Sequence, residues 1–216
     1  METGVKRPYR STLREVNANA TRLTIVQAAG GLFIERGYVA TSIEAIAEAA
    51  GVSRATVFTS VGGKPVLLKK AYDIALVGDD ADVPLVQRAA SQAIRAEPNV
   101  ERFLDRYAGL VTEINGRLAR IYEAVRGAAS ADPDVRDVFD KIQTERRVGS
   151  GRVIEDVQSK GPLRPGLTAE VAADLLWVLN DAGLYHLLVH QRGWPQEQFQ
   201  TWLSASMRAQ LLGTQE

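Results

Sequence analysis

The sequence predicts an all-α protein, and three observations lead to this expectation. Apolar residues recur three or four positions apart along most of the 216 residues, which is the period of an amphipathic helix. Glycine, proline and cap-forming residues separate these periodic segments, so each expected helix has a start and an end in the sequence. No segment alternates apolar and polar residues as a half-buried strand does.

The first helix is expected from Ala18 to Arg36. Leu23, Val26 and Phe33 fall at helical spacing and form one apolar stripe. Gly37 follows, as expected of a residue that ends a helix in the left-handed conformation. The preceding residues are polar, and we expect a flexible basic arm over residues 1–17 that carries Lys6, Arg7, Arg10 and Arg14.

Two short helices follow, and caps and glycines bound both of them closely. The segment Thr41–Glu44 reads as a capping box, with a hydroxyl at the N-cap and a carboxylate three residues later. The helix that it starts is expected over residues 42–50, and Gly51 ends it. Ser53 is a good N-cap for the next helix, which the pair Gly62-Gly63 terminates.

The rest of the chain predicts longer helices and two breaks. Lys64-Pro65 opens a helix that ends near Val77, since proline is well tolerated in a first turn. The polar segment 78–84 is expected to be a linker, which places one domain at 18–77 and another at 78–216. A second break contains two prolines and two glycines and covers residues 159–166. The remaining helices are expected at 84–97, 99–128, 133–158, 168–190 and 195–212.

Composition limits the classes of function. The chain has no cysteine, which excludes disulfides, thiolate metal sites and cysteine nucleophiles. Its two histidines, His186 and His190, argue against a multi-histidine metal centre. No apolar run approaches the ~18–20 residues that cross a bilayer, and no signal peptide is recognisable. We therefore expect a cytoplasmic protein without a metal or another cofactor.

The formal net charge of zero hides an asymmetry along the chain. Residues 1–70 hold ten Lys and Arg against five Asp and Glu, whereas residues 71–216 hold 16 against 21. A basic front segment on an acidic body indicates that only the front segment meets a polyanion. Random scatter of charge in a neutral protein is the alternative.

The two short helices have the spacing of a helix-turn-helix. Ala47 is small where a second helix must cross close above it, and Gly51 supplies the left-handed turn. Val57 then returns to an apolar core that it shares with Ile46. Small and short polar side chains remain on the outer face of the second helix, and they suit the major groove, which is about 12 Å wide. These residues are Ser53, Arg54, Ala55, Thr56 and Thr59.

The run "IVQAAGGLFIERGYVATSIEAIAEAAGVSRATVF", followed by Lys64 and Leu67-Leu68, makes residues 18–77 resemble the DNA-binding domain of a TetR-type transcriptional regulator. The run "GLTAEVAADLLWVL…LYHLLVHQRGWPQEQF" is similar to the last two helices of many members. The resemblance implies an N-terminal three-helix DNA-binding domain. It also implies that a connecting helix joins this domain to a C-terminal bundle for ligand binding and dimerisation.

The family pattern also implies which residues contact DNA. Arg54 is the strongest candidate to read a guanine edge, and a surface arginine that meets phosphate or nothing is the alternative. Lys64 starts a helix, where a cation is unfavourable unless a phosphate lies near. Phe58 is expected to pack in the small core rather than stack on a base. The implied DNA-contacting residues are Thr41, Ser42, Ser53, Arg54, Ala55, Thr56, Phe58, Thr59, Ser60 and Lys64.

One segment departs from the family pattern. The aromatic-rich segment after the recognition helix reads "FTSVGGK" here, so Phe58 lacks the phenol hydroxyl that would reach a phosphate. The fold is expected to be unaffected, whereas the set of operator contacts is expected to differ.

In the C-terminal domain, polar residues on apolar helices are the candidates for an effector pocket, with ordinary core packing as the alternative for each. They are Tyr107, Glu113, Tyr122, Arg126, Trp177, Asn180, Asp181 and Tyr185. The last two helices carry more apolar residues than one buried stripe needs, so a second copy is expected to cover the rest. The expected interface residues are Leu176, Leu179, Leu187, Trp202, Met207 and Leu211.

The expected function is that of a DNA-binding transcriptional regulator. The leading hypothesis is a homodimeric repressor that a small apolar effector releases from a pseudo-palindromic operator, without a membrane partner. An activator and a relative that has lost operator reading are the alternatives. No nucleophile–base pair, phosphate-cradling loop or metal-ligand pattern in the sequence supports an enzyme.

Overall fold

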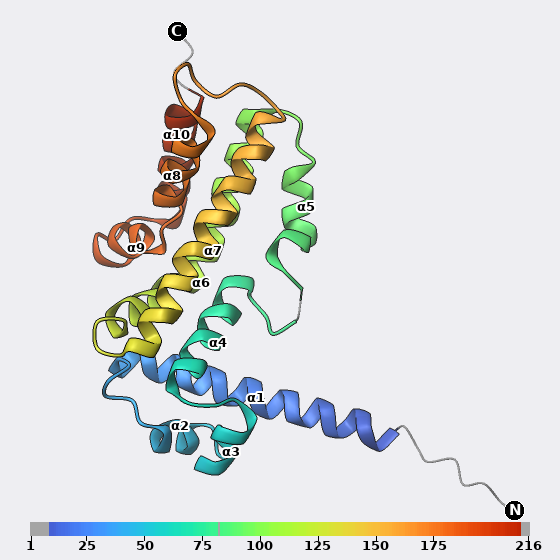
Figure 1. Ribbon diagram of the computed structural model, residues 1–216, viewed down its shortest axis with the longest axis vertical. Coiled ribbons are helices and arrows are strands. Elements are labelled where there is room, and N and C mark those ends of the chain that lie inside the picture. The colour runs from blue at the N-terminus through green and yellow to red at the C-terminus, as the bar shows by residue number, and fades with distance from the viewer. Residues whose placement is uncertain (1–8, 82, 213–216) are drawn as a thin grey trace, which may run out of the picture. The chain divides into compact units, whose positions relative to one another are not determined.

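The computed structural model describes residues 9–81 and 83–212, with side chains from residue 16 onward (Figure 1). These residues form helices and no strand, which confirms the predicted all-α class. The chain divides into two compact units, Met1–Ala71 and Tyr72–Glu216. The division lies inside helix α4, whereas the sequence placed the boundary at the linker that follows it. The reason is that the last turns of α4 make their contacts with the second unit.

The first unit consists of α1 (Tyr9–Arg36), α2 (Ile43–Ala49), α3 (Arg54–Ser60) and the start of α4 (Lys64–Val77). Residues 9–17 are helical rather than a flexible arm, because a helix that packing has nucleated extends over polar residues at one hydrogen bond per residue. The remainder of the predicted arm lies outside the described residues. The core of the unit contains Ile25, Val26, Phe33, Ile46, Val57, Leu67 and Leu68.

The start of α2 differs from the predicted capping box. Ser42 is the N-cap, and its Oγ accepts a hydrogen bond from the Ala45 N–H at 3.1 Å. Thr41 is only 1% exposed, and its hydroxyl points to the carbonyl oxygens of Leu32 at 3.2 Å and Gly37 at 2.8 Å. The prediction of Thr41 as the N-cap is therefore wrong, because its hydroxyl closes the turn between α1 and α2.

The predicted boundaries of α3 are confirmed. Gly51 has a φ of +66°, the left-handed backbone that the turn before α3 requires. Ser53 caps the helix, since its Oγ accepts from the Thr56 N–H at 3.1 Å. At the other end, Arg22 of α1 donates to the carbonyl oxygen of Ser60 at 3.4 Å. A helix of seven residues is too short to be stable alone, so these contacts and the core hold it.

The second unit is built on two long antiparallel helices, α6 (Val100–Ala128) and α7 (Pro133–Gln158). Helix α8 (Ala169–Leu179) packs on α7, and α10 (Gln196–Leu211) packs on α6. Figure 1 shows α8 and α10 side by side, as their contacts require. The core of this unit contains Phe103, Leu104, Leu118, Ile142, Ile154, Leu176, Phe199, Leu203 and Met207.

The predicted helix 84–97 is shorter than expected. It consists of a 3₁₀ turn, Leu85–Gln87, and helix α5, Ala89–Arg95. Among the described helices of both units, none is long and apolar enough to cross a membrane.

The predicted helix 168–190 is interrupted. Helix α8 ends at Leu179, the short α9 covers Ala182–Tyr185, and a π-helical turn covers His186–Gln191. Asp181 causes the new start, because its Oδ1 accepts from the Gly183 N–H at 2.7 Å as an N-cap. Periodicity could not reveal this break, since apolar residues continue across it.

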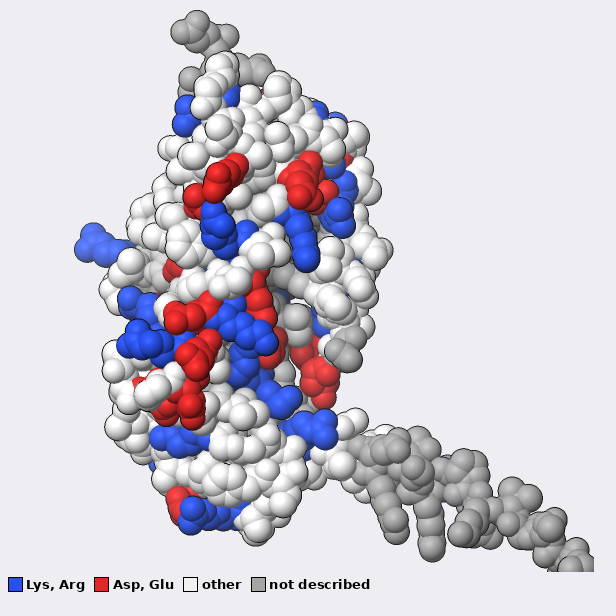
Figure 2. Space-filling view, in the orientation of Figure 1, with Lys and Arg blue, Asp and Glu red and all other residues white. Residues whose placement is uncertain are grey.

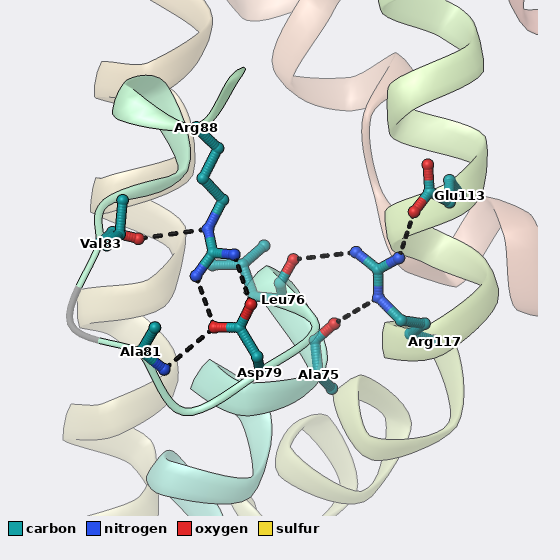
Figure 3. A network of polar contacts seen from close by, with 8 residues as sticks. All are labelled: Ala75, Leu76, Asp79, Ala81, Val83, Arg88, Glu113 and Arg117. Carbon is teal, nitrogen blue, oxygen red and sulfur yellow. Dashed lines mark hydrogen bonds and ion pairs between the residues drawn. The ribbon is translucent and has the colours of Figure 1, made fainter. Parts of the chain in front are cut away.

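The C-terminal end of α4 is held by polar contacts within the second unit (Figure 3). Arg117 of α6 donates to the carbonyl oxygens of Ala75 at 3.3 Å and Leu76 at 3.5 Å. Its Nη1 lies 2.6 Å from Glu113 Oε1, which fixes the guanidinium in place. A cation at a helix C-terminus also matches the helix dipole.

The linker after α4 is closed by a second ion pair (Figure 3). Arg88 donates to both carboxylate oxygens of Asp79, at 2.6 and 2.7 Å, and to the carbonyl oxygen of Val83 at 3.2 Å. Hydrogen bonds from Arg88 and from the Ala81 N–H lower the pKa of Asp79 to about 2. The described residues of the predicted linker, 78–81 and 83–84, therefore have a defined local structure.

Candidate nucleic-acid interface and pocket

Helix α3 turns one face to the core of the first unit and the opposite face to solvent. Val57 and Ile46 are both 0% exposed, and Ala47 is buried where α3 crosses α2. The structure therefore brings the predicted groove-face residues together on one surface. Ser53, Arg54, Ala55 and Thr59 are exposed there, and Thr56 and Ser60 are half-buried.

The hydroxyl groups on this surface bond to the helix itself. Ser53 Oγ and Thr56 Oγ1 are 2.8 Å apart, so one donates to the other. Thr59 Oγ1 donates to the carbonyl oxygen of Ala55 at 3.0 Å. These bonds leave small side chains lying close to the backbone, which lets a helix approach a groove wall closely.

Arg54 is the long charged side chain of the surface. Its Nη1 lies 2.8 Å from Glu44 Oε1 of α2, although both side chains are largely exposed. Glu44, which the sequence placed in the capping box, therefore orients Arg54. The guanidinium carbon also lies 5.7 Å from the centre of the Phe58 ring.

Phe58 does not occupy the core position that the sequence predicts. It is 46% exposed, because its neighbour Val57 fills the core instead. The aromatic ring therefore belongs to the solvent-facing surface of α3.

The three candidates for phosphate contacts have different environments. Ser42 is exposed at the N-cap of α2, where a phosphate could reach it. Thr41 is buried and its hydroxyl is engaged, so its side chain is removed from the candidate contacts. Lys64 is half-buried, and its Nζ lies 4.3 Å from the centre of the Tyr38 ring. The ring stabilises the cation at a helix start, where the dipole disfavours it.

Charges of both signs are interleaved on the face of the second unit in Figure 2. On this face, the excess of acidic residues in the unit is not gathered into one patch. Among the described residues, no group of three or more His, Asp or Glu is placed to hold a metal ion. His186 and His190 pack edge to face, with ring centres 5.5 Å apart.

A polar network crosses the interior of the second unit. Arg146 of α7 forms an ion pair with Asp181 Oδ2 at 2.8 Å, donates to the carbonyl oxygen of Trp177 at 3.0 Å and bonds to Gln143 Oε1. The phenol of Tyr122 donates to Asp181 at 2.8 Å and accepts from Gln143 at 2.9 Å. Burial, reinforced by the Asp181 carboxylate, raises the pKa of Tyr122 to about 12, so the phenol keeps its proton.

A pocket of about 390 Å³ lies next to this network in the second unit. Its volume falls within the range of small-molecule sites. Three lining residues carry buried polar atoms that have no partner within the described structure: Glu123 Oε1, Trp177 Nε1 and His186 Nδ1. The lining residues are Glu123, Arg126, Trp177, Val178, Asp181, Gly183, Leu184, His186, Leu187 and Gln191.

The structure brings only part of the predicted pocket residues to this cavity. Arg126, Trp177 and Asp181 line it. Tyr107 is bonded to Asn180 at 2.8 Å, and Tyr185 is buried in the core. Glu113 does not line the cavity, because it is exposed and holds Arg117.

The prediction missed Arg146, whose position in the sequence contained a signal. It lies four residues after Ile142 and four before Ser150, which are both buried on α7. A charged residue on the buried face of a helix needs a partner of opposite charge, so its position in the sequence indicates a buried ion pair. Glu123 carried no such signal, since it lies beside the more conspicuous Tyr122.

The predicted dimer-interface residues differ in exposure. Leu176, Met207 and Leu211 are 0% exposed and belong to the core of the unit, so they are not free to meet a second copy. Leu179 and Trp202 are half-buried. The apolar side chains that remain exposed on this side are Val171 (49%), Val178 (52%) and Leu187 (50%).

The comparisons with known proteins agree with the helix-turn-helix in the first unit. Residues 25–71 match the family described as bacterial regulatory proteins, tetR family. The chain is 27% identical, over 158 residues, to the HTH-type transcriptional regulator YdeS of Bacillus subtilis, covering 73% of this chain and 74% of that protein.

Solved structures share the fold over most of the chain. NalD of Pseudomonas aeruginosa, the secondary repressor of the MexAB-OprM multidrug efflux pump, superposes with a TM-score of 0.66 at 21% identity, over 90% of this chain and 97% of that one. A transcriptional regulator from Saccharomonospora viridis in complex with choline superposes with a TM-score of 0.65 at 19% identity, over 89% and 98% of the two chains. The predicted resemblance to the tetR family is thus confirmed over residues 25–71, and the curated relative is a transcriptional regulator, as the sequence predicted, and not an enzyme.

Proposed function

We propose that this chain, which is a transcriptional regulator of the TetR family, acts as a homodimeric repressor that a small, mainly apolar molecule releases from its operator. The observation that carries the proposal is the exposed face of α3. A serine cap, a left-handed glycine and the buried Val57 hold that face in one orientation. A recognition helix that enters the major groove needs such a fixed orientation.

A second copy is part of the proposal because one helix of seven residues reads only a few base pairs. Two copies on half-sites about 34–36 Å apart, or a multiple of that spacing, would read a pseudo-palindrome. The exposed valines of α8, Val171 and Val178, lie one heptad apart on one face and support an interface there. Leu187 adds to the exposed apolar surface just after α9.

The effector is proposed to bind in the pocket of the second unit. The pocket borders the Arg146–Asp181–Tyr122 network, and the same unit holds the end of α4 through Arg117. Helix α4 continues into the first unit, which also contains α3. A shift of this network would therefore be transmitted to the exposed face of α3, the reading surface, through one continuous helix. Coupling between two such sites is typically worth about 1–3 kcal/mol and is reciprocal.

The relatives support the two halves of this proposal separately. NalD is a repressor of a multidrug efflux pump, and the regulator from Saccharomonospora viridis binds choline. These neighbours make repression and small-molecule binding reasonable expectations for this chain.

The test of DNA binding is nuclease footprinting of the purified full-length chain on the DNA that flanks its own gene. Discrete protection of an inverted repeat is expected. Diffuse or absent protection would contradict operator reading. Fusion of the protected promoter to a reporter then separates repression from activation, since a repressor lowers expression and an activator raises it.

The test of the dimer is sedimentation of Val178→Glu, with Val148→Glu as the matched control. Both valines are 52% exposed, but Val148 lies on α7 and Val178 lies on the proposed interface. Val178→Glu is expected to shift the chain toward monomer, while Val148→Glu stays dimeric. Equal sedimentation of the two variants would place the interface elsewhere.

A further inference from the structure

An apolar patch lies at the centre of the exposed face of α3, and it consists of Ala55 and Phe58. Among the described residues, Phe58 is the one aromatic ring in the set of exposed large hydrophobic side chains, whose other members are valines and one leucine. The first unit does bury its other described rings, since Phe33 is 1% exposed and Tyr38 is 6% exposed. The exposure of Phe58 therefore does not reflect the lack of a core.

The hydroxyl groups around this patch have little capacity left to donate to base edges. The proton of Thr59 is used within α3, and one proton of the Ser53–Thr56 pair is used between the two side chains. One hydroxyl proton of that pair and the hydroxyl of the half-buried Ser60 remain for a partner. A surface with so few donors cannot satisfy a run of bases through hydrogen bonds alone.

Arg54 supplies the charged donors beside the patch. It precedes Phe58 by four residues, so both side chains lie on one face of the helix. Its guanidinium carbon is 5.7 Å from the centre of the Phe58 ring, and Glu44 holds one end of it at 2.8 Å. The two side chains would therefore meet neighbouring base pairs rather than distant ones.

We propose that Phe58, with Ala55, reads the 5-methyl group of a thymine next to a guanine that Arg54 reads. The proposal rests on the proposed function, because it requires α3 to enter the major groove. The thymine methyl is the apolar group that a major-groove base edge presents, and phenylalanine and alanine are suitable contacts for it. Any other base edge under the ring would lose water and gain no hydrogen bond. Each operator half-site therefore contains adjacent T·A and G·C pairs, with both reading groups in the major groove.

The experiment is an in vitro selection of duplexes from a random library by the full-length chain. It is run once with a library that contains thymine and once with the same library prepared with uracil. Uracil keeps the pairing and the O4 acceptor of thymine and removes only the methyl group. The best sequence from the thymine library is then titrated as the all-thymine duplex and with uracil at single positions.

One thymine in each half-site, next to a guanine, is expected to lose affinity when uracil replaces it. Removing one buried methyl group corresponds to a loss of about fourfold, and to about 15-fold when both half-sites are changed. Identical motifs and affinities with thymine and uracil would overturn the inference while leaving the proposed function intact. The absence of any enriched motif in both libraries would overturn the proposed function and the inference with it.

Variants of the protein test whether Phe58 is the side chain that contacts the thymine methyl group. Phe58→Ala should bind the thymine and uracil duplexes equally, whereas Val39→Ala, which removes an exposed apolar side chain of the same unit outside α3, should keep the difference. A general loss of stability in Phe58→Ala would weaken both duplexes alike and would not abolish the difference between them. Retained discrimination in Phe58→Ala would assign the methyl contact to another residue and overturn the role of Phe58.

Discussion

The two units of the chain treat their polar side chains in opposite ways. In the first unit, the polar groups of α2 and α3 lie at the surface and bond to nearby backbone or to each other, as Ser42, Ser53 and Thr59 do. In the second unit, polar groups are buried between helices, and Arg146 joins α7 to α8 and α9.

The same contrast holds for groups that lack a partner. Among the described residues, the buried polar side-chain atoms without a hydrogen bond all belong to the second unit: Asn115 Nδ2, Glu123 Oε1, Trp177 Nε1, Asn180 Oδ1 and His186 Nδ1. Each such atom costs about 1–3 kcal/mol relative to a satisfied one. In the described residues of the first unit, the buried polar side chains therefore have their hydrogen bonds before a partner binds. The second unit has an interior that gains free energy when a ligand or a rearrangement supplies the missing bonds.

The largest expected effect comes from breaking the buried network. Arg146→Met leaves the carboxylate of Asp181 without its cation in a site where the two side chains are 15% and 28% exposed. We expect a loss of about 2–4 kcal/mol in the free energy of unfolding, since removing one partner of a buried pair strands the other. Urea unfolding of the full-length chain measures it.

The control for this prediction is the next residue along α7. Arg147→Met breaks ion pairs with Asp174 and Glu170 at the surface, so no measurable change is expected. Equal free energies of unfolding for the two variants would show that the buried network contributes no more to stability than a surface ion pair.

The next effect concerns the reading surface. Arg54→Ala is expected to lose about 1–3 kcal/mol of preference for the operator over random DNA, because it removes a base-edge contact. Lys64→Ala is expected to weaken binding to both DNAs and to reduce the salt dependence by about one phosphate contact. Titrations at several salt concentrations measure both quantities. If both variants lose the same amount on both DNAs, the division between base and phosphate contacts is incorrect.

A smaller effect on stability is expected when either of the two neighbouring hydroxyls at the start of α2 is removed. Thr41→Val removes the hydroxyl that donates to the carbonyl oxygens of Leu32 and Gly37, at a cost of about 1–2 kcal/mol of stability. Ser42→Ala removes an N-cap, at a cost of about 1 kcal/mol. Thermal unfolding compares them, and DNA affinity at a temperature where both are folded is expected to fall only for Ser42→Ala. A loss of affinity in Thr41→Val under those conditions would return Thr41 to the contact residues.

The smallest expected effect is the acid response of the linker. The pKa of Asp79 falls from 3.8 to about 2 in the folded chain, so its contacts add stability above pH 3.8. That stability is lost as the pH falls from 3.8 toward 2, because the folded carboxylate must then take up a proton. Carboxyl NMR titration should place the Asp79 midpoint near 2 in the wild type and closer to 3.8 in Arg88→Gln. An unchanged midpoint in the variant would assign the shift to the backbone bond from Ala81.

The sequence predicted most of the first unit because its signals are local. A glycine at 37 or 51, a serine at 53 and the spacing of Ile46 and Val57 each act within a few residues, so they fix helix ends and the core without knowledge of distant contacts. The error at Thr41 is instructive, because Thr41 and Ser42 both carry a hydroxyl that can cap a helix. The choice between them depends on carbonyl oxygens at Leu32 and Gly37 that only the folded turn brings near.

The second unit was predicted less completely, for a physical reason. The sequence by itself determined where most helices run and which residues are apolar, since both follow from the period of 3.6 residues. The tertiary structure alone decided which polar residue meets which: that Arg146 pairs with Asp181, that Tyr122 donates to the same carboxylate, and that Arg117 donates to the end of α4. Partners 35 or more positions apart leave no periodic trace in a single chain, because their meeting depends on how whole helices pack.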